Sequence, residues 1–344
     1  MNKTIDLRSD TVTQPTPAMR EAMYRAELGD DVFGEDPSIN RLETTAAEKM
    51  GKEAALFVAS GTMANLVSVL THTQRGDEVI LGSESHILEH ELGSAATFGG
   101  LQMRAITNAG GKLDPIDVAA AMRPQEGNVP RTGLICLENT HNRCGGVALT
   151  AEYTATISDI GHRNEVPVHL DGARIFNAAV ALGVQPKALT ASVDSVAFCL
   201  SKGLSCPVGS LVCGSAEFIQ RARKYRKMVG GGMRQAGILA AAGIVALEQM
   251  IDRLAEDHEN ARILAYGLAE IPGISLNPAT VQSNIVVFEL VSEKEDPAQF
   301  VERLGSLGLK TLPFGGRRVR AVTHYGISRS DVDDALSLVR QALA

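Results

Sequence analysis

Between residues 55 and 214, short and almost wholly apolar runs alternate with segments of helical periodicity, and this alternation narrows the possible folds more than any other feature. The apolar runs cover residues 55–58, 78–81, 103–107, 134–138, 166–170, 195–200 and 210–213, with helical patterns between several of them, for example at 62–71 and 175–182. Strands without a polar face are typical of a sheet that helices cover on both sides. The pattern predicts an α/β fold on a mainly parallel, seven-stranded sheet.

The pattern changes after the glycine run at residues 230–232. Residues 235–270 read as one long helix, bent or straight, and the elements expected after it are a strand at 284–290, a helix at 297–307, a strand at 318–323 and a helix at 330–343. These elements predict a smaller α+β domain, for which a chain of 344 residues is long enough. We therefore expect a large domain with the N-terminal segment at 1–245 and a small C-terminal domain at 246–344.

Composition and charge argue against several classes of protein. The net charge is −7, and acidic and basic residues are mixed along the chain, which disfavours nucleic acid or an anionic membrane as a partner. The N-terminus MNKTIDLRSD lacks the apolar segment of a secretory signal, and the most apolar stretch, ILAAAGIVAL, is too short to span a membrane. The five cysteines include no CxxC pair, as expected of reduced thiols. We expect a cytoplasmic protein and assign no residue to a metal.

The segment SVAFCLSKG, residues 195–203, carries the strongest chemical signal. An apolar strand runs into Lys202, which stands between Ser201 and Gly203. Ligands of α/β sheets bind at the carboxyl ends of strands, and lysine is rarely buried without a reason. A desolvated lysine has a lowered pKa and can form Schiff bases with carbonyl compounds. The alternative is a surface lysine at a strand–loop junction.

Two further segments place polar groups at strand ends. In VPVHLDGAR a strand ends at Asp171, whose carboxylate needs a cationic partner. That partner is either Arg174, in a merely structural pair, or the protonated pyridine nitrogen of a pyridoxal cofactor. In LFVASGTMAN a strand leads through Ser60, Gly61 and Thr62 into a helix, whose free N–H groups can hold a phosphate. An ordinary helix cap has the same pattern.

The order of these signals is more specific than any one of them. A phosphate cradle, an aspartate that ends one strand and a lysine that ends the next resemble the aspartate-aminotransferase-like group of pyridoxal-phosphate enzymes, fold type I. Motifs along nearly the whole chain are similar to those of the low-specificity L-threonine aldolase family: IDLRSDTVT, GDDVFGEDP, ENTHN, HLDGARIFNA, CLSKGL, RKMVGGGMRQAGILAAAG and VRAVTH. The resemblance implies an enzyme that uses pyridoxal 5'-phosphate to cleave L-threonine, L-allo-threonine and related β-hydroxy-α-amino acids to glycine and an aldehyde.

The resemblance also implies roles for single residues. Lys202 would carry the cofactor, and Asp171 would meet its ring nitrogen. Ser9, Arg174 and Arg320 would hold the substrate carboxylate, which suits the two-pronged guanidinium of arginine. The motifs and the resemblance together predict that the residues in contact with the cofactor are Ser60, Gly61, Thr62, His86, Asp171, Arg174, Ser201, Lys202 and Arg234.

Histidines are candidates for proton transfer because imidazole titrates near neutral pH. His86, in GSESHILEHE, matches the residue that the family stacks on the cofactor ring, and His141, in ENTHN, matches one near the β-hydroxyl. A loop cap for His86 and a strand-end donor for His141 are the structural alternatives. The sequence leaves open which of the two, or a water, is the base. We expect His169 to be a hydrogen-bonded strand histidine, and the histidines expected to be solvated on helices are His72, His162 and His258.

His90 is one of four departures from the family pattern. It stands where phenylalanine or tyrosine is common, four residues after His86 and hence on the same face of a helical turn. We expect it to line the pocket for the aldehyde. The other departures are Phe33 in place of tyrosine, a loop RCGGVAL that is one residue longer than usual, and Ser205–Cys206 in place of a Gly-Ala type pair. The sequence leaves open the preference among threonine, allo-threonine and β-aryl substrates.

The segment RKMVGGGMRQ carries Lys227 and Arg234 on a backbone that its glycines make flexible. The family places this segment at a subunit interface, which implies that Arg234 and Lys227 reach the active site of a neighbouring subunit. Shared sites require at least a dimer, and the resemblance favours a homotetramer. The alternative is solvated charge beside a domain linker.

Two other functions are compatible with parts of the pattern. Another fold type I enzyme, such as a β-eliminating lyase or an aminotransferase, would share Lys202 and Asp171 but would release pyruvate or consume a keto acid. An aldolase that prefers L-phenylserine belongs to the same class of alternatives. A non-catalytic binding protein on an inherited fold is disfavoured because Lys202, Asp171, Arg174 and both candidate histidines are present.

Overall fold

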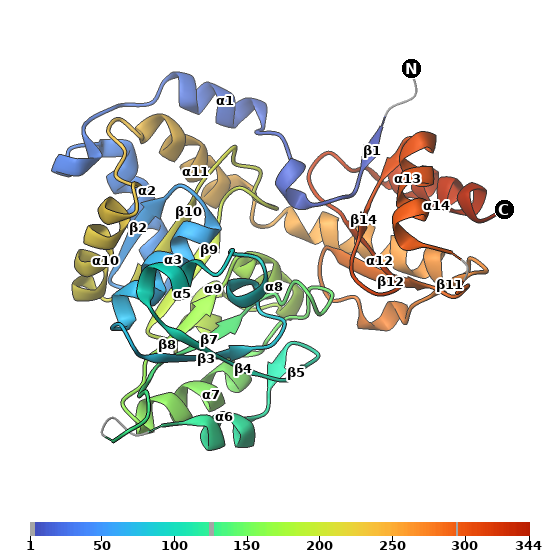
Figure 1. The fold of residues 1–344 in the computed structure, drawn as a ribbon. Helices are drawn as coiled ribbons and strands as arrows, with labels where there is room; N and C mark the ends of the chain where they lie inside the picture. Colours follow the sequence, from blue (N-terminus) through green and yellow to red (C-terminus); the bar gives the residue numbers. More distant parts are fainter. Residues whose placement is uncertain (1–3, 124–126, 294) are drawn as a thin grey trace.

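The computed structural model describes residues 4–123, 127–293 and 295–344. Its largest sheet has seven strands in the order β2-β10-β9-β8-β7-β3-β4 (Figure 1). These strands are β2 (Ala54–Val58), β3 (Glu78–Gly82), β4 (Gln102–Ile106), β7 (Thr132–Glu138), β8 (Val168–Asp171), β9 (Ser195–Cys199) and β10 (Ser210–Gly214). β10 runs antiparallel to both neighbours, and the other adjacent pairs are parallel. The prediction of a mainly parallel, seven-stranded sheet is confirmed.

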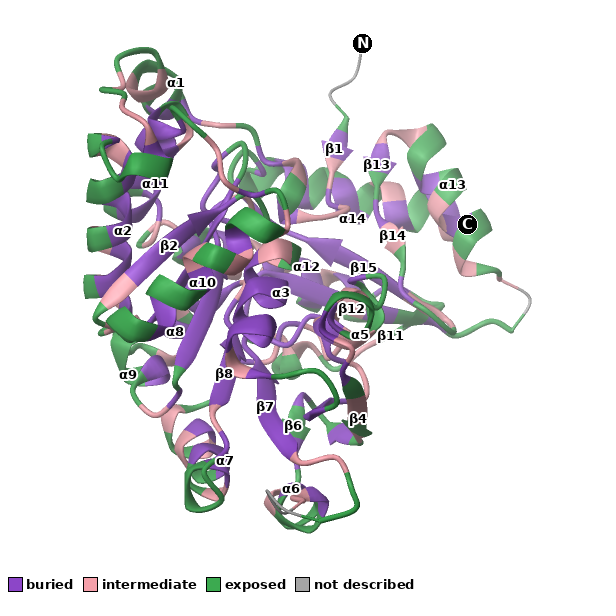
Figure 2. Ribbon diagram, turned by 60° about the vertical axis from the view of Figure 1, so that its left-hand side comes forward, coloured by how far each residue is buried: buried purple, intermediate pink, exposed green. Residues whose placement is uncertain are grey.

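Alternating side chains explain why helices cover both faces of this sheet. In β2, Phe57 packs into the largest apolar cluster, whereas its neighbours Leu56 and Val58 pack into a separate one. The helices of the first cluster include α2 (Pro37–Met50), α7 (Ala151–Arg163), α8 (Ile175–Leu182) and α11 (Gly237–Gln249), and those of the second are α3 (Gly61–His72) and α10 (Ala216–Met228). The strands between these layers are buried along most of their length (Figure 2).

Shorter elements surround this core. They are α1 (Pro17–Tyr24), α4 (His86–Glu89), α5 (Ser94–Gly99), α6 (Pro115–Ala121), α9 (Pro186–Thr190) and the hairpin of β5 (Asn108–Ala109) and β6 (Lys112–Leu113). α1 packs along α11 at the edge of the molecule (Figure 1).

The C-terminal part has its own antiparallel sheet in the order β11-β12-β15-β14. Its elements are α12 (Leu254–Ala269), β11 (Ile274–Ser275), β12 (Ile285–Leu290), α13 (Pro297–Leu307), β14 (Leu312–Pro313), β15 (Arg318–Val322) and α14 (Arg329–Leu343). The core of this part includes Phe288 and Phe300, whose rings meet edge to face with centroids 6.5 Å apart. The strands and helices predicted after residue 283 are confirmed.

The prediction of a single long helix at 235–270 is wrong, because α11 ends at Gln249 and a separate helix, α12, begins at Leu254. The two helices serve different cores. α11 contributes Ala240 and Leu247 to the cluster under the large sheet, and α12 contributes Leu264 to the C-terminal cluster. Periodicity continues across the break, so the sequence does not reveal that the packing partner changes there.

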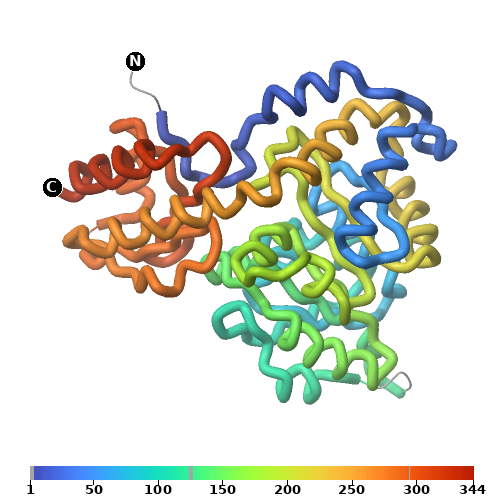
Figure 3. Tube along the Cα trace, turned by 180° about the vertical axis from the view of Figure 1, so that it is seen from behind, coloured from blue at the N-terminus to red at the C-terminus, as the bar shows by residue number. Residues whose placement is uncertain are grey.

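The N-terminal segment packs on the C-terminal part of the chain. β1 (Ile5–Asp6) pairs in parallel with β13 (Leu309–Lys310), and Ile5 and Leu7 belong to the C-terminal apolar cluster. Figure 3 shows this blue segment beside the orange and red elements before the chain crosses to α1. Because residue 245 lies within α11, we propose on packing grounds that the domain boundary falls between α11 and α12.

Among the described residues, no helix combines the length and the apolar character that crossing a bilayer requires.

Candidate active site

The carboxyl ends of the parallel strands bring two carboxylates to one edge of the large sheet. Asp171, the last residue of β8, pairs in register with Glu138, the last residue of β7. The buried Asp171 accepts hydrogen bonds from Asn65 Nδ2 (2.8 Å) and from the backbone N–H of Ala173 (3.1 Å). One side-chain amide and one backbone N–H therefore donate to this carboxylate, and no lysine or arginine among the described residues forms an ion pair with it.

Arg174 does not pair with Asp171. Its Nε and Nη2 each donate to the carboxylate of Asp10 over 2.7 Å, and both side chains are buried. Burial opposes ionisation of Asp10, but the ion pair with Arg174 outweighs it and, with the charge of Lys202, holds the pKa of Asp10 well below its usual range. The alternative in which Asp171 serves only as the ion-pair partner of Arg174 is thus wrong, because Asp10 has that place.

Lys202 lies three residues beyond the end of β9 and is partly buried. Among the residues that the structure describes, its ammonium has no hydrogen-bond or ion-pair partner. Its charge lowers the pKa of Asp10 and opposes the rise in the pKa of His86. The amine is therefore available to a ligand.

The amino end of α3 lies beside the end of β9. Ser60 caps this helix by accepting a hydrogen bond from the backbone N–H of Met63 (3.2 Å), and Ser60 and Thr62 are exposed. A side chain at Gly61 would come within 2.9 Å of Cys199 Sγ, so glycine allows the helix to begin against the strand that leads to Lys202. An anion at this helix end would meet free backbone N–H groups. Ser201 is partly buried next to Lys202.

His86 begins α4, and its neighbours orient its ring. Its backbone N–H donates to Glu138 (2.8 Å), and its Nδ1 lies 2.9 Å from Glu91 Oε1. Burial alone would lower the pKa of His86, but the hydrogen bond to Glu91 and the charges of Asp171 and Glu91 raise it above its usual value, against the charge of Lys202. The exposed His90 lies on the same side, with its ring centroid 5.4 Å from that of His86.

His141 is buried in the loop after β7. Its Nε2 lies 3.5 Å from Asn108 Nδ2 and 4.0 Å from Glu138. Its Nδ1 has no hydrogen-bond partner among the described residues. One ring nitrogen of a buried imidazole is thus left for a ligand or a water.

Arg320, on β15, is a buried cation without a carboxylate partner in the described part of the chain. Its Nη1 donates to Asn142 Oδ1 (2.8 Å) and its Nη2 to the carbonyl of Arg8 (3.1 Å), while its Nε has no partner. Burial, followed by the charge of Arg174, lowers the pKa of Arg320 to about 10. A buried cation that faces a second cation is poised for an anion. Ser9, the residue after Arg8, caps a short turn: its hydroxyl oxygen accepts hydrogen bonds from the backbone N–H and the hydroxyl of Thr11.

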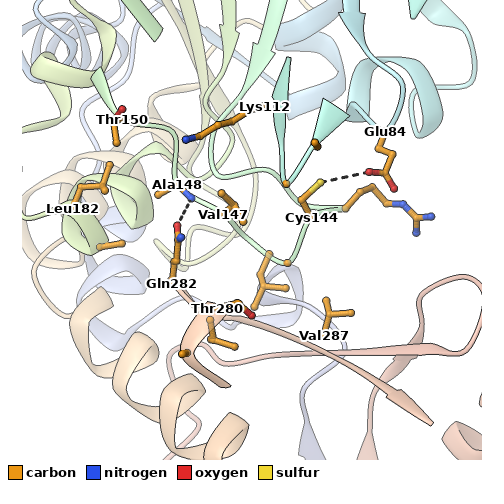
Figure 4. A pocket seen from close by; sticks show the side chains of 18 of the residues that line it. Glu84, Lys112, Cys144, Val147, Ala148, Thr150, Leu182, Thr280, Gln282 and Val287 are labelled. Carbon is orange, nitrogen blue, oxygen red and sulfur yellow. Dashed lines mark hydrogen bonds between the residues drawn. The ribbon is translucent and has the colours of Figure 1, made fainter. Parts of the chain in front are cut away.

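A cavity of about 330 Å³ brings three of the predicted residues together, namely His86, His90 and Arg320. The other residues that line it include Asn142, Arg143 and Phe314. A larger cavity of about 990 Å³, shown in Figure 4, is lined by the loop at 143–145, by β12 and by the turn that precedes β12. Cys144 and Glu84 line that cavity, 3.5 Å apart, but none of the predicted site residues does. Arg143 borders both spaces.

Arg234 lies apart from these residues. It is exposed and forms an ion pair with Asp30 (3.1 Å). Within one chain, the structure therefore brings together Asp171, His86, His90, Lys202, Arg174 and Arg320 but not Arg234.

Four further histidines lie outside the predicted site. His169 is hydrogen-bonded within β8 as predicted, to Ser195 and Asn65. The prediction of solvated side chains is wrong for His72 and His258, which are both half-buried: His72 lies 2.8 Å from Ser195 Oγ and stacks on Phe218, and His258 lies 3.1 Å from Asn177. His162 is exposed. Helical periodicity does not indicate whether a neighbouring helix packs over a histidine and buries it.

Sequence reasoning missed Asp10, Asn65, Glu91 and Asn142, each of which contacts a predicted site residue. All four lie inside the segments IDLRSDTVT, LFVASGTMAN, GSESHILEHE and ENTHN, in which their neighbours carried the chemical signal. Nothing in the sequence distinguishes Asn65 and Glu91 from ordinary helix and loop residues.

Comparison with known proteins relates this chain to one family. The family described as beta-eliminating lyase matches residues 6–290. Low-specificity L-threonine aldolase 1 of Arabidopsis thaliana is 46% identical over 346 residues, which cover 99% of this chain and 97% of that protein. The low specificity L-threonine aldolase of Escherichia coli (strain K12) is 45% identical over 341 residues, 99% of each chain.

Solved structures agree on the fold. The threonine aldolase of Leishmania major has a TM-score of 0.83 over 99% of this chain and 100% of that chain, at 19% identity. A serine palmitoyltransferase from Sphingomonas wittichii has a TM-score of 0.77 over 98% of this chain and 87% of that one, at 20% identity. The fold is that of the fold type I pyridoxal-phosphate enzymes.

Proposed function

Because the chain belongs to the beta-eliminating lyase family and, within it, to the low-specificity L-threonine aldolases, we propose that it cleaves L-threonine, L-allo-threonine and related β-hydroxy-α-amino acids to glycine and an aldehyde. The enzyme is a carbon–carbon lyase. The single observation that carries its substrate class is Arg320: a buried cation without a carboxylate partner among the described residues, in a cavity that His86 and His90 also line. Such a cation suits the carboxylate of an amino acid.

The donor set fits pyridoxal 5'-phosphate. Lys202 offers an amine without a partner in the described part of the chain, Asp171 a buried carboxylate, and the amino end of α3 a place for the phosphate at Ser60, Gly61 and Thr62. We assign Ser201 to the same phosphate site. When bound, the cofactor supplies an electron sink for the Cα–Cβ bond that breaks.

The residues of the chain then bind and orient the substrate. Arg320 would hold the carboxylate through Nε, which is unpaired, and Ser9 would approach from the N-terminal segment. Arg174 can contribute both N–H groups of Nη1 and the second N–H of Nη2, because Asp10 engages its Nε–H and one N–H of Nη2. This grip would orient the substrate so that the Cα–Cβ bond is the one that breaks. Asp171 would meet the ring nitrogen of the cofactor and favour its protonated form.

Proton transfer falls to the imidazoles near this space. The β-hydroxyl proton must leave before the aldehyde can depart. His141 has Nδ1 without a partner among the described residues, and His86 lines the cavity. Either imidazole, or a water that it holds, can accept the proton, and comparison of His141→Asn with His86→Asn in single turnover separates the two. The aldehyde departs past His90.

The test of the proposed function is a product assay. L-threonine, L-allo-threonine and L-phenylserine are supplied in turn, and glycine is quantified against acetaldehyde or benzaldehyde. Equal amounts of glycine and aldehyde are expected. Pyruvate or a requirement for a keto acid would instead identify a β-eliminating lyase or an aminotransferase, and no product from any substrate would favour a binding protein.

The cofactor site has its own test. Lys202→Ala should lower turnover by at least about 10³-fold, because Lys202 is the proposed attachment point. Reduction of the native enzyme with borohydride should fix the cofactor to the peptide that contains Lys202. The exposed Lys187 provides a matched control, since Lys187→Ala should retain full turnover. Reduced cofactor on another lysine would contradict the assignment.

We further propose a cytoplasmic homotetramer built from dimers that share active sites. Exposed apolar side chains support the burial of surface against a second copy: Tyr24 is 86% exposed, Phe33 72%, Leu92 100% and Met228 74%. Lys227 lies in the last turn of α10 beside Met228, and Arg234 lies between α10 and α11; both would reach the partner's site. The described cysteines are free thiols, as expected of a reducing compartment.

Subunit complementation tests the shared site. Arg234→Ala and Lys202→Ala chains are mixed and allowed to exchange, and activity is measured together with the fraction of hybrids. Recovered activity supports a site that two subunits complete. If hybrids form without recovery, Arg234 acts within its own subunit or outside catalysis. Sedimentation of the native enzyme distinguishes dimer from tetramer.

A further inference from the structure

A continuous chain of hydrogen bonds runs behind Asp171, away from the cavity. Asn65 Nδ2 lies 2.7 Å from Glu91 Oε1 and 2.8 Å from Asp171 Oδ2. Asn65 Oδ1 lies 3.2 Å from His169 Nε2, and His169 Nδ1 lies 2.8 Å from Ser195 Oγ. These four links join α3, β8, β9 and the segment after α4, and all five residues are buried.

The chain continues to a second histidine. Ser195 Oγ also lies 2.8 Å from His72 Nε2, at the end of α3. The ring of His72 stacks on Phe218, with centroids 4.4 Å apart and an interplanar angle of 28°. The far end of the chain is therefore fixed by packing against α10.

Proton counting gives every link one direction. An amide NH₂ carries two protons, and an ionised carboxylate only accepts. Asn65 therefore gives one proton to Asp171 and one to Glu91, and its Oδ1 must accept from His169 Nε2–H. Burial, against the charge of Asp171, lowers the pKa of His169 to about 4, so at neutral pH its Nδ1 carries no proton.

The remaining links follow from that neutral ring. His169 Nδ1 accepts the proton of the Ser195 hydroxyl, and Ser195 Oγ then accepts from His72 Nε2–H. Burial, followed by the charge of His169, lowers the pKa of His72 to about 3, so this ring is neutral as well. With Asp171 and Glu91 both ionised, this assignment uses each proton once. A reversed Asn65 amide would set its oxygen against two carboxylates and its NH₂ against His169 Nε2–H.

We propose that Asn65 is a positioning residue, which holds Asp171 and Glu91 side by side in their ionised forms, and that the His72–Ser195–His169 chain fixes the orientation of its amide. The proposal rests on the proposed function insofar as Asp171 is the residue that serves the cofactor ring. Two adjacent buried carboxylates repel each other, and each needs a donor to stay ionised. Asn65 gives one donor to each, and His86 Nδ1–H gives Glu91 a second.

The same arrangement explains a cluster that could be mistaken for a cation site. One ligand atom each from His86, Glu91 and Asp171 lies within 4.8 Å of the others. The two N–H groups of Asn65 already point at both carboxylates, and a cation there would face these donors at close range. We therefore assign the cluster to hydrogen bonding.

The first experiment measures the histidine tautomers directly in the cofactor-loaded enzyme. Protein labelled with ¹⁵N-histidine is studied by long-range ¹H–¹⁵N spectra at pH 7.5, with His169→Gln and His72→Gln for assignment. His169 and His72 should both be neutral with the proton on Nε2. An imidazolium or an Nδ1–H tautomer at His169 would overturn the proposal, whatever reaction the enzyme catalyses.

The second experiment measures the dissociation constant of pyridoxal 5'-phosphate. Asn65→Leu keeps the size of the side chain but removes both donors, and it should raise this constant about 10-fold or more. Ser68→Ala, on the same buried face of α3, should change it less than 2-fold, because Ser68 bonds only to the Ala64 carbonyl of its own helix. An unchanged constant in folded Asn65→Leu would refute the positioning role.

Ser195→Ala separates the two parts of the proposal. It leaves Asn65 in place but removes the link that selects the tautomer of His169. The spectrum of His169 should then show both neutral tautomers, and the cofactor should bind more weakly than to the native enzyme but more tightly than to Asn65→Leu. A single Nε2–H tautomer in Ser195→Ala would mean that the outer chain does not orient Asn65. If the tautomers agree while the product assay fails, the proposed function is wrong and the chain of hydrogen bonds is not.

Discussion

The two sides of Asp171 differ in how completely their polar groups are paired. On the side of α3, Asn65, His169 and Ser195 use their side-chain donors and acceptors within the chain of hydrogen bonds. On the side of the C-terminal part, Arg320 Nε and His141 Nδ1 are buried without a hydrogen-bond partner among the described residues. We call these the paired side and the open side.

The difference separates stability from binding. A buried polar group without a partner costs about 1–3 kcal/mol, and native proteins contain few of them. Such groups are retained where a ligand supplies the missing hydrogen-bond partner. Changes on the paired side should therefore weaken the folded state, and changes on the open side should weaken ligand binding with little effect on unfolding.

The largest expected effect is at Asp171, where the two sides meet. Asp171→Asn keeps the shape and can still accept from Asn65, so the cofactor should remain bound. The neutral amide cannot stabilise a protonated ring nitrogen, and kcat should fall about 10²–10³-fold, as for loss of other electrostatic groups in active sites. Turnover and bound cofactor are measured together. Near-native kcat with full cofactor would remove Asp171 from the reaction.

Two buried arginines provide the sharpest comparison. Arg320→Gln should lower kcat/KM for L-threonine roughly 100-fold, through loss of charge-assisted hydrogen bonds to the substrate, while the free energy of unfolding stays the same or rises. Arg174→Gln leaves the buried charge of Asp10 uncompensated and should reduce the free energy of unfolding by about 3–5 kcal/mol. Unfolding of both variants in denaturant measures this difference in the free energy of unfolding. If both variants lose the same free energy of unfolding, the distinction between the open side and the paired side does not hold.

Acid should act on the paired side. The folded-state pKa of His169 is about 4, lowered by burial, below the value of about 6.5 in an unfolded chain. Between these values the unfolded chain binds more protons, so stability is full above about pH 6.5 and falls as the pH drops toward 4. We expect His169 to contribute about 1–2 kcal/mol to the loss between pH 7.5 and 5. His169→Gln should remove that part of the slope when denaturant unfolding is measured from pH 7.5 to 5.

The smallest expected effect is at His90, at the outer rim of the open side. His90→Phe adds apolar surface and removes a hydrogen-bonding ring from the cavity that His86 and Arg320 also line. The ratio of kcat/KM for L-phenylserine to that for L-threonine should change about 3-fold or more, which needs only about 0.7 kcal/mol. Its direction depends on whether the lost hydrogen bond or the gained apolar contact is larger. Proportional changes for both substrates would place His90 outside the aldehyde pocket.

Sequence was sufficient for the parts of the molecule that local pattern decides. The strands of the large sheet, the strand ends at Asp171 and near Lys202, and the elements after residue 283 follow from apolar runs and their punctuation. Pairing between distant residues did not follow. Arg174 finds Asp10 across 164 positions, and Asn65 finds Asp171 across 106. Each of these polar residues has several partners of suitable chemistry in the sequence, and only the packed fold selects one.

The pairing of β1 with β13 has a consequence for synthesis of the chain. Ile5 leaves the ribosome early, but its partner Leu309 follows only about 300 residues later. At typical rates of about 5–20 residues per second, the first strand waits roughly 15–60 s for its partner. During that interval the strands from β2 to β10 can already pair, since all of them precede residue 215. Ser9 and Asp10, which follow β1 directly, can therefore reach their final places only when the chain is nearly complete.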